Sequence, residues 1–280
     1  MIQAALYIVA TPIGNRDDIS TRAKEVLASV QVIAAEDTRH SRILLDSLEI
    51  KTPLMALHEH NERAASDTIL KRIQQGEAIA LISDAGTPLL SDPGYFLVRQ
   101  AQQENITVIP IPGACAAIVA LSAAGLPTDR FCFEGFLPAK AGPRKQTLEK
   151  LQHETRTLIF YEAPHRILDS LQAMQEVFGP QREAVMGREL TKKFETIRRA
   201  PLGELVPWVA ADAMQQKGEF VVLVHGAAEQ EMMSEKDQQA RAILKVLCEE
   251  LPVAQAARMV AAITGLKKNY VYDLALGIKG

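Results

Sequence analysis

The chain has 280 residues, 48% of them hydrophobic and 23% charged, and its 31 basic and 34 acidic side chains give a net charge of -3. This composition is typical of a soluble globular protein long enough for two domains. The slight acidic excess argues against a protein that coats nucleic acid non-specifically, but it is compatible with a local basic patch. No apolar run reaches the roughly 18 residues of a membrane span, so we expect no membrane partner.

The three cysteines, Cys115, Cys132 and Cys248, are far apart and form no CxxC pair or Cys/His cluster. They are typical of small buried hydrophobes in a reducing compartment. The amino terminus lacks the pattern of a secretory signal. We therefore expect a cytoplasmic protein that binds no metal.

Strands and amphipathic helices alternate through the first half of the chain. This rhythm predicts an α/β fold with a mainly parallel sheet. A helix is expected over 20–29, with Ser20 as its N-cap, and another over 67–75. The strand-like runs lie near 6–11, 31–35, 78–83 and 106–111.

Three of these strands run into loops of small residues. The loops are Thr11–Asn15, Ser83–Pro88, which recurs in weaker form as Ser91–Gly94, and Pro112–Ala117. In open α/β sheets, ligands bind at the carboxyl ends of the strands, so we expect one shared crevice for a small polar ligand. Gly86 allows close backbone approach, and Pro88 suits the first turn of a helix. The alternative is a tight turn in which Asp84 caps that helix. No pattern for a nucleoside triphosphate or a dinucleotide is present.

The pattern changes after a turn at Gly125–Thr128. Strands are expected at 130–136, 157–162, 183–187 and 220–225, with helices at 148–153 and 166–178. They predict a second, mixed-sheet domain, which places the ligand crevice near a domain cleft.

The end of the chain is helical in pattern. Residues 226–235 are predicted to form a linker, followed by helices at 238–249, 254–264 and 268–276, the last two joined by Gly265. These helices suit a helix-turn-helix that binds nucleic acid or a small capping or dimerising bundle.

Seven motifs, in this order, resemble the ribosomal RNA small subunit methyltransferase I group of the tetrapyrrole methylase superfamily. Two positions depart from the group: Arg16 replaces a usually apolar residue, and Ala114 stands where Pro often follows Pro112 and Gly113. The motifs are Thr11–Asn15, Ala35–Arg39, Ser83–Gly94, Leu121–Pro127, Glu134–Lys140, Tyr161–Arg166 and Arg188–Lys192.

The resemblance implies two α/β domains that enclose S-adenosylmethionine, over 1–115 and 116–226, and a helical tail over 227–280. It also implies methyl transfer to the ribose 2′-hydroxyl of a cytidine in the decoding region of small-subunit ribosomal RNA. The expected partners are that RNA, within the assembled subunit, and a second copy of the chain in a homodimer.

The resemblance assigns the cofactor to the strand-end loops and to the facing domain. Backbone groups in loops of small residues suit a cofactor with charged amino, carboxylate and sulfonium groups. Tyr161 is expected to cover the adenine, the alternative being an ordinary core aromatic. The residues assigned are Pro12, Gly14, Asp84, Gly86, Thr87, Pro88, Pro112, Gly113, Ala114, Cys115, Ala116, Tyr161 and Glu219.

Candidates for a base that takes the hydroxyl proton are Glu36 and Asp37, at a strand end. A structural ion pair between Asp37 and Arg39 is the competing interpretation. His58 is favoured for substrate contact or packing over metal binding, because residues two apart, such as His58 and His60, do not share a helix face.

The remaining catalytic candidate is Lys140, which is also placed with the cationic residues expected to hold RNA phosphates. Those residues are Arg39, Lys140, Arg166, Arg188, Lys192, Lys267 and Lys268. Two rival functions stay open at this point: a methyltransferase of the same superfamily that acts on a tetrapyrrole or a protein residue, and a ribosome assembly factor without turnover.

Overall fold

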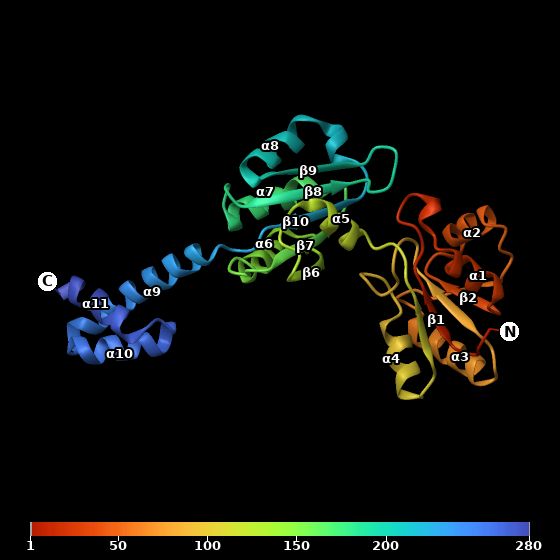
Figure 1. The fold of residues 1–280 in the computed structure, drawn as a ribbon, viewed down its shortest axis with the longest axis horizontal. Helices are drawn as coiled ribbons and strands as arrows, with labels where there is room; N and C mark the ends of the chain where they lie inside the picture. Colours follow the sequence, from red (N-terminus) through yellow and green to blue (C-terminus); the bar gives the residue numbers. More distant parts are fainter. Residues whose placement is uncertain (1, 280) are drawn as a thin grey trace. The chain divides into compact units, whose positions relative to one another are not determined.

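The structure is a computed structural model that describes residues 2–279, excluding the side chains of 229–235 and 279. The chain divides into two compact units, one formed by Met1–Glu149 with Thr157–His225 and the other by Lys150–Arg156 with Gly226–Gly280. Both sheets belong to the first unit, and the three terminal helices belong to the second (Figure 1).

The first sheet is parallel throughout, with the strand order β3-β2-β4-β1-β5. Strands β2 and β4 are buried along their whole length, as expected of a sheet covered on both faces. Helices α1 and α2 pack on one face, and α3 and α4 pack on the other. The elements are β1 (Leu6–Val9), a 3-10 turn (Arg16–Asp18), α1 (Thr21–Ser29), β2 (Val32–Ala35), α2 (Thr38–Ser47), β3 (Leu54–Ala56), α3 (Glu62–Gln74), β4 (Ile79–Ile82), α4 (Tyr95–Gln103) and β5 (Val108–Ile111).

Ser20 caps α1 as predicted, because its hydroxyl accepts a hydrogen bond from the Ala23 amide at 3.1 Å. The helix expected over 67–75 is longer, and β3 was not expected at all. Three residues are too few for the alternation that predicts a strand to become visible in the sequence.

The loop after β4 differs from the prediction. No helix begins at Pro88 and Asp84 caps none, since α4 starts only at Tyr95. The backbone turns repeatedly on the way, with positive φ at Leu89, Ser91 and Gly94. The Glu62 carboxylate accepts hydrogen bonds from the Gly94 and Phe96 amides at 2.9 and 3.0 Å. An acid from α3 therefore supplies the N-terminal capping of α4.

The second sheet is mixed, as predicted, with the order β6-β7-β10-β8-β9 and a single parallel pair, β6 with β7. Helix α5 packs small residues, Ala117, Ala120 and Ala124, against the buried side chains of β7, β8 and β10. The elements are α5 (Ala116–Ala124), β6 (Phe131–Phe136), α6 (Ala141–Lys150), β7 (Thr157–Glu162), α7 (Ile167–Phe178), β8 (Glu183–Arg188), β9 (Thr196–Pro201), α8 (Leu202–Ala211), a 3-10 turn (Ala213–Gln216) and β10 (Phe220–Val224).

Two expectations for this region were wrong. The helix predicted at 148–153 is α6, which ends at Lys150 and begins at Ala141. Pro143 lies in its first turn, where a missing amide hydrogen breaks no helical hydrogen bond. The basic segment that ends at Arg199 includes strand β9, which was not expected and which pairs with β8.

The second unit contains α9 (Glu229–Glu250), α10 (Val253–Thr264) and α11 (Lys268–Lys279). The linker predicted over 226–235 is therefore wrong for most of its length, because α9 begins at Glu229. Gly265, at φ 70°, ends α10 in the left-handed conformation and forms the predicted turn to α11. The three helices share a core of buried residues that includes Leu244, Val260 and Val271. Among the described residues, no helix is long and apolar enough to cross a membrane.

Candidate functional site

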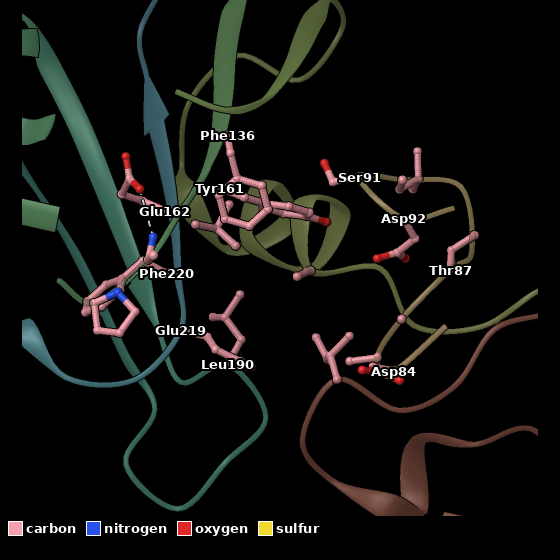
Figure 2. Close-up of a pocket in the computed structure, with 18 of the residues that line it drawn as sticks. Asp84, Thr87, Ser91, Asp92, Phe136, Tyr161, Glu162, Leu190, Glu219 and Phe220 are labelled. Carbon is pink, nitrogen blue, oxygen red and sulfur yellow. Dashed lines mark hydrogen bonds between the residues drawn. The ribbon is translucent and has the colours of Figure 1, made fainter. Parts of the chain in front are cut away.

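A cavity of about 420 Å³, here called the large cavity, lies in the first unit where several strand ends meet (Figure 2). One wall comes from the loop after β4, with Asp84, Thr87 and Asp92, and the facing wall carries Phe136 and Tyr161. The lining residues are Ile13, Glu36, Asp84, Ala85, Gly86, Thr87, Leu90, Ser91, Asp92, Ala116, Phe136, Tyr161, Glu162, Ala163, Pro164, Leu190, Glu219, Phe220 and Val221.

Hydrogen bonds between loops fix the first wall. The loops after β1 and β4 pair through Thr11 and Gly86, whose amides donate to each other's carbonyls at 2.8 and 3.1 Å. Gly86 has φ 79°, a conformation that a side chain disfavours. The Thr87 hydroxyl donates to the Ala114 carbonyl at 2.9 Å, and the Asp37 amide donates to the Asp84 carboxylate at 3.2 Å. Four strand ends are thereby tied together, which confirms that the expected loops meet.

Burial and neighbouring acids raise the pKa of two carboxylates on this wall. Burial, followed by the charges of Asp84 and Asp92, raises the pKa of Glu36. Burial raises the pKa of Asp92 to about 6, against the lowering effect of a hydrogen bond with Ser83. A cluster of this kind can attract a cation or accept a proton close to neutral pH.

The facing wall is aromatic. Tyr161 makes edge-on contacts with the rings of Phe133 and Phe136, at centroid distances of 4.9 and 5.7 Å. Its hydroxyl accepts a hydrogen bond from the Ala117 amide at 3.3 Å, which joins β7 to the start of α5. Tyr161 is thus both part of the core and exposed to the cavity, so the two roles predicted for it are compatible. Leu190 and Val221 extend the apolar surface.

Glu162 lines the large cavity but is fully engaged. Its carboxylate accepts from the Ser170 hydroxyl at 2.5 Å and from the Ala163 amide at 2.8 Å, and it forms an ion pair with Arg166 at 2.9 Å. The buried Arg144 donates to the same Ser170 hydroxyl at 3.0 Å. This network fixes the backbone at Ala163 and Pro164, and it commits Arg166, a predicted RNA contact, to an internal ion pair.

A second cavity of about 260 Å³, here called the small cavity, adjoins the large one. The close approach of two loops shapes it: a Cβ on Gly14 would lie 2.5 Å from Lys192 Cγ and 2.8 Å from Thr191 Oγ1. The Asn15 amide also donates to Thr191 Oγ1 at 3.1 Å. The lining residues are Pro12, Ile13, Gly14, Arg16, His40, Ile43, Leu44, Asp84, Ala85, Lys192 and Glu219.

The residues assigned to the cofactor fall into three sets. Asp84, Gly86, Thr87, Ala116, Tyr161 and Glu219 line the large cavity. Pro12 and Gly14 line the small cavity, together with Asp84 and Glu219 again. Pro88, Pro112, Gly113, Ala114 and Cys115 line neither, although the Ala114 carbonyl holds Thr87.

The two candidate bases occupy different environments. Glu36 faces the large cavity, whereas Asp37 is the N-cap of α2 and accepts from the Arg39 amide at 2.8 Å. The Asp37 carboxylate also forms an ion pair with the Arg39 guanidinium at 3.0 Å. Hydrogen bonds from that guanidinium and from the Arg39 amide lower the pKa of Asp37 to about 2.

Four other predicted residues lie outside the large cavity. His58 packs edge-on to His60 at 6.0 Å, and its buried Nδ1 has no hydrogen-bond partner among the described residues. Lys140 is exposed just before α6. Arg188 is buried and donates to the Lys217 and Phe194 carbonyls. Lys192, on the wall of the small cavity, forms ion pairs with Glu189 and Glu219.

Lys267 and Lys268 belong to the second unit, where both are exposed at the start of α11. No group of three or more His, Cys, Asp and Glu side chains that could hold a metal is present in the part of the chain described.

Sequence reasoning missed several cavity residues, among them Asp92, Phe136, Leu190 and Glu162–Pro164. Asp92 had a visible signal, since Ser91–Gly94 repeats the loop before it. Phe136, Leu190 and Glu162–Pro164 lie in motifs that carry the family resemblance. The local sequence does not show, however, whether a side chain in such a motif faces a cavity or the core.

Two family models match the chain. Residues 5–206 match the tetrapyrrole (corrin/porphyrin) methylases, and residues 234–279 match the RsmI C-terminal HTH domain. The chain belongs to the tetrapyrrole methylase family. The second match favours the helix-turn-helix among the two alternatives for the tail.

Individual relatives agree with this assignment. One from Pseudomonas aeruginosa, named ribosomal RNA small subunit methyltransferase I, is 57% identical over 280 residues, covering 100% of this chain and 99% of the relative. The resemblance predicted from the seven motifs is thereby confirmed.

Solved structures of the family share the fold. The methyltransferase CobJ matches with a TM-score of 0.60 at 19% identity, over 80% of this chain and 95% of that chain. Uroporphyrin-III C-methyltransferase from Thermus thermophilus, complexed with S-adenosyl homocysteine, matches with a TM-score of 0.55 at 15% identity, over 78% and 96%. The predicted fold class, two α/β domains with a small helical domain after them, is confirmed.

Proposed function

We propose that this chain is an S-adenosylmethionine-dependent methyltransferase of small-subunit ribosomal RNA, and that its acceptor is the ribose 2′-hydroxyl of a cytidine in the decoding region. The main support is the 57% identity, over the whole chain, to a relative that carries the name ribosomal RNA small subunit methyltransferase I. The homodimer remains a prediction from the resemblance, and the cytoplasmic location remains a prediction from the cysteine pattern.

The large cavity fits the cofactor. Its volume of about 420 Å³ falls within the roughly 300–1,000 Å³ of small-molecule sites. The carboxylates of Asp84 and Asp92 complement the cationic sulfonium and amino groups, and the Tyr161 and Leu190 surfaces suit an adenine. A relative of the same fold is complexed with S-adenosyl homocysteine, the product that remains after methyl transfer. We therefore assign the cofactor to the large cavity, held by Asp84, Thr87, Asp92 and Tyr161.

When bound, S-adenosylmethionine supplies an electrophilic methyl group. The chain has to hold the acceptor oxygen in line with that group, exclude water and take the hydroxyl proton. Glu36 is the better candidate for the proton acceptor, because its pKa is raised and it faces the cavity. Asp37 is a weak base at a pKa of about 2 and acts instead to position α2. A placed base accelerates such a step by about 10²–10⁴-fold.

RNA recognition involves the helical tail in this proposal. Lys267 and Lys268 lie exposed at the start of α11 and suit phosphate contacts, which fix register without reading sequence. A ribose hydroxyl inside a folded RNA reaches a cavity only when its nucleotide is splayed out. Because the 2′-hydroxyl is the acceptor, DNA of the same sequence should receive no methyl group.

The test is transfer of a radiolabelled methyl group from S-adenosylmethionine to small ribosomal subunits that lack this modification, with the labelled nucleotide mapped. We expect the label on the ribose of a decoding-region cytidine and none on a deoxy substitute. Glu36→Gln should lower the single-turnover rate while cofactor affinity stays near the wild-type value. Label on a base, or on the deoxy substrate, would contradict the proposed acceptor.

A further inference from the structure

The two cavities share a wall formed by Ile13, Asp84, Ala85 and Glu219, residues that line both. The two cavities therefore adjoin each other at these residues. This adjacency is the arrangement that a group transfer between two bound molecules requires.

The charges of the two linings differ. Acidic side chains line the large cavity, among them Glu36 and Asp92, and it has no Lys, Arg or His. The small cavity has three cationic or titratable nitrogen groups, on Arg16, His40 and Lys192, and its only acids are the two on the shared wall. The lining of the large cavity suits a cationic ligand, and the lining of the small cavity suits an anionic one.

Two of these three groups are available for a ligand. Lys192 Nζ is engaged with Glu189 and Glu219, at 3.0 and 2.7 Å, so it supports the wall. The exposed side chains of Arg16 and His40, in contrast, have no hydrogen bond or ion pair within the described residues. Arg16 begins a 3-10 turn that Asn15 caps, which holds its backbone in place.

The small cavity also offers an apolar face. Ile43, on α2, is 60% exposed and lines the cavity beside Leu44. An exposed apolar side chain next to an unpaired guanidinium and an unpaired imidazole is a suitable contact for a nucleotide, which has a flat base and a phosphate. The volume of about 260 Å³ is too small for a tetrapyrrole ring but is of the size needed for a single nucleotide or part of one.

We propose that the small cavity is the acceptor subsite and binds one nucleotide of the RNA. Arg16 and His40 contact its phosphate, Ile43 contacts its base, and its ribose lies at the wall shared with the cofactor. This inference rests on the proposed function, because it names where the acceptor of that reaction is bound.

The first experiment measures binding without turnover. Protein saturated with S-adenosyl homocysteine is titrated with cytidine 5′-monophosphate, and binding is followed by NMR shift changes. The variants are Arg16→Ala and Ile43→Ser, and the control is Arg22→Ala, an exposed arginine on α1 that lines neither cavity. We expect weak binding by the wild type and by Arg22→Ala, and at least a fivefold loss in the other two variants.

The second experiment measures methylation of small subunits. Arg16→Ala should raise KM about tenfold with little change in kcat, leave the Kd for S-adenosylmethionine unchanged, and reduce the salt dependence of RNA binding by about one phosphate contact. Equal behaviour of Arg16→Ala and Arg22→Ala, or a matching loss of cofactor affinity, would overturn the assignment of the small cavity.

The two experiments distinguish a failure of the proposed function from a failure of the proposed subsite. If the wild type methylates no ribosomal RNA but still binds the mononucleotide through Arg16 and Ile43, the subsite stands and the RNA assignment is wrong. If subunits are methylated normally and no variant affects mononucleotide binding or KM, the subsite is wrong and the function stands.

Discussion

Asp92→Asn tests the electrostatics of the large cavity, because the partly buried Asp92 carboxylate lowers the folding stability of the protein when no cofactor is bound. Burial raises its pKa from 3.8 to about 6. Between these two values the folded chain binds a proton that the unfolded chain lacks, so stability falls as the pH rises through this window. Below it both states are protonated and there is no penalty, and above it the whole penalty applies.

The difference between the two pKa values corresponds to at most about 3 kcal/mol. Because the Asp92 side chain remains partly open to water, screening reduces this figure, and we expect about 1 kcal/mol. Asn has the same shape and retains an oxygen that can accept from Ser83. Asp92→Asn should therefore stabilise the cofactor-free protein at pH 7.5, and because pH 4.5 lies inside the window only about a third of that gain should remain there.

The assay is denaturant and thermal unfolding of both proteins at the two pH values. The expected gain at pH 7.5 is about 1 kcal/mol, or about 2–4 °C in Tm for a unit of this size. Asp129→Asn, which removes an exposed acid that lines neither cavity, is the matched control. Destabilisation by Asp92→Asn at both pH values would show that hydrogen bonding, and not charge, decides its contribution.

Three further predictions concern packing and local structure. Gly14→Ala should destabilise the first unit by about 1–3 kcal/mol in denaturant unfolding, since its Cβ would lie 2.5 Å from Lys192 Cγ. The control variant Gly142→Ala has open space around its Cβ and should be close to neutral. Ser20→Ala should cost about 1 kcal/mol through the lost cap of α1, and Ser20→Asn should restore most of it; equal stability of Ala and Asn would refute the cap. Leu244→Ala should cost about 2–5 kcal/mol and increase amide exchange in α9–α11 only; increased exchange in the sheets would contradict two separate units.

The regular part of the fold was predictable because its signal is local. The strands of the first sheet are short apolar runs, three of which lead into loops that contain Gly and Pro, and all but β3 were expected close to their observed ends. Strand β9 was missed because it alternates exposed and half-buried residues at the sheet edge, where Arg198 and Arg199 look like a solvated basic segment. The burial pattern of β9 follows from its position at the edge of the sheet, and this position is not visible in the sequence.

The candidate site was predictable only as a set of loops. Asp84, Gly86 and Thr87 were found because small residues after a strand indicate a crevice. The roles of individual charges were not found, since they depend on partners far along the chain. In the sequence, Arg188 and Arg166 cannot be distinguished from exposed arginines. In the structure, Arg188 is buried and donates hydrogen bonds to backbone carbonyls, whereas Arg166 forms an ion pair with the buried Glu162.

The conformation of the loops beside the two cavities depends on tertiary contacts more than on the local preferences of their residues. Of the six non-glycine residues with positive φ in the described chain, four lie in the two loops beside the cavities: Leu89, Ser91, Glu189 and Thr191. Each such residue costs roughly 1–3 kcal/mol and persists only where surrounding structure holds it. That structure is present here: Glu62 holds the end of one loop through the Gly94 amide, and Glu195 accepts from the Thr191 amide at 2.6 Å in the other. Because these anchors come from outside each strained turn, substituting Glu62 should loosen the wall that carries Asp92 without touching a single cavity residue.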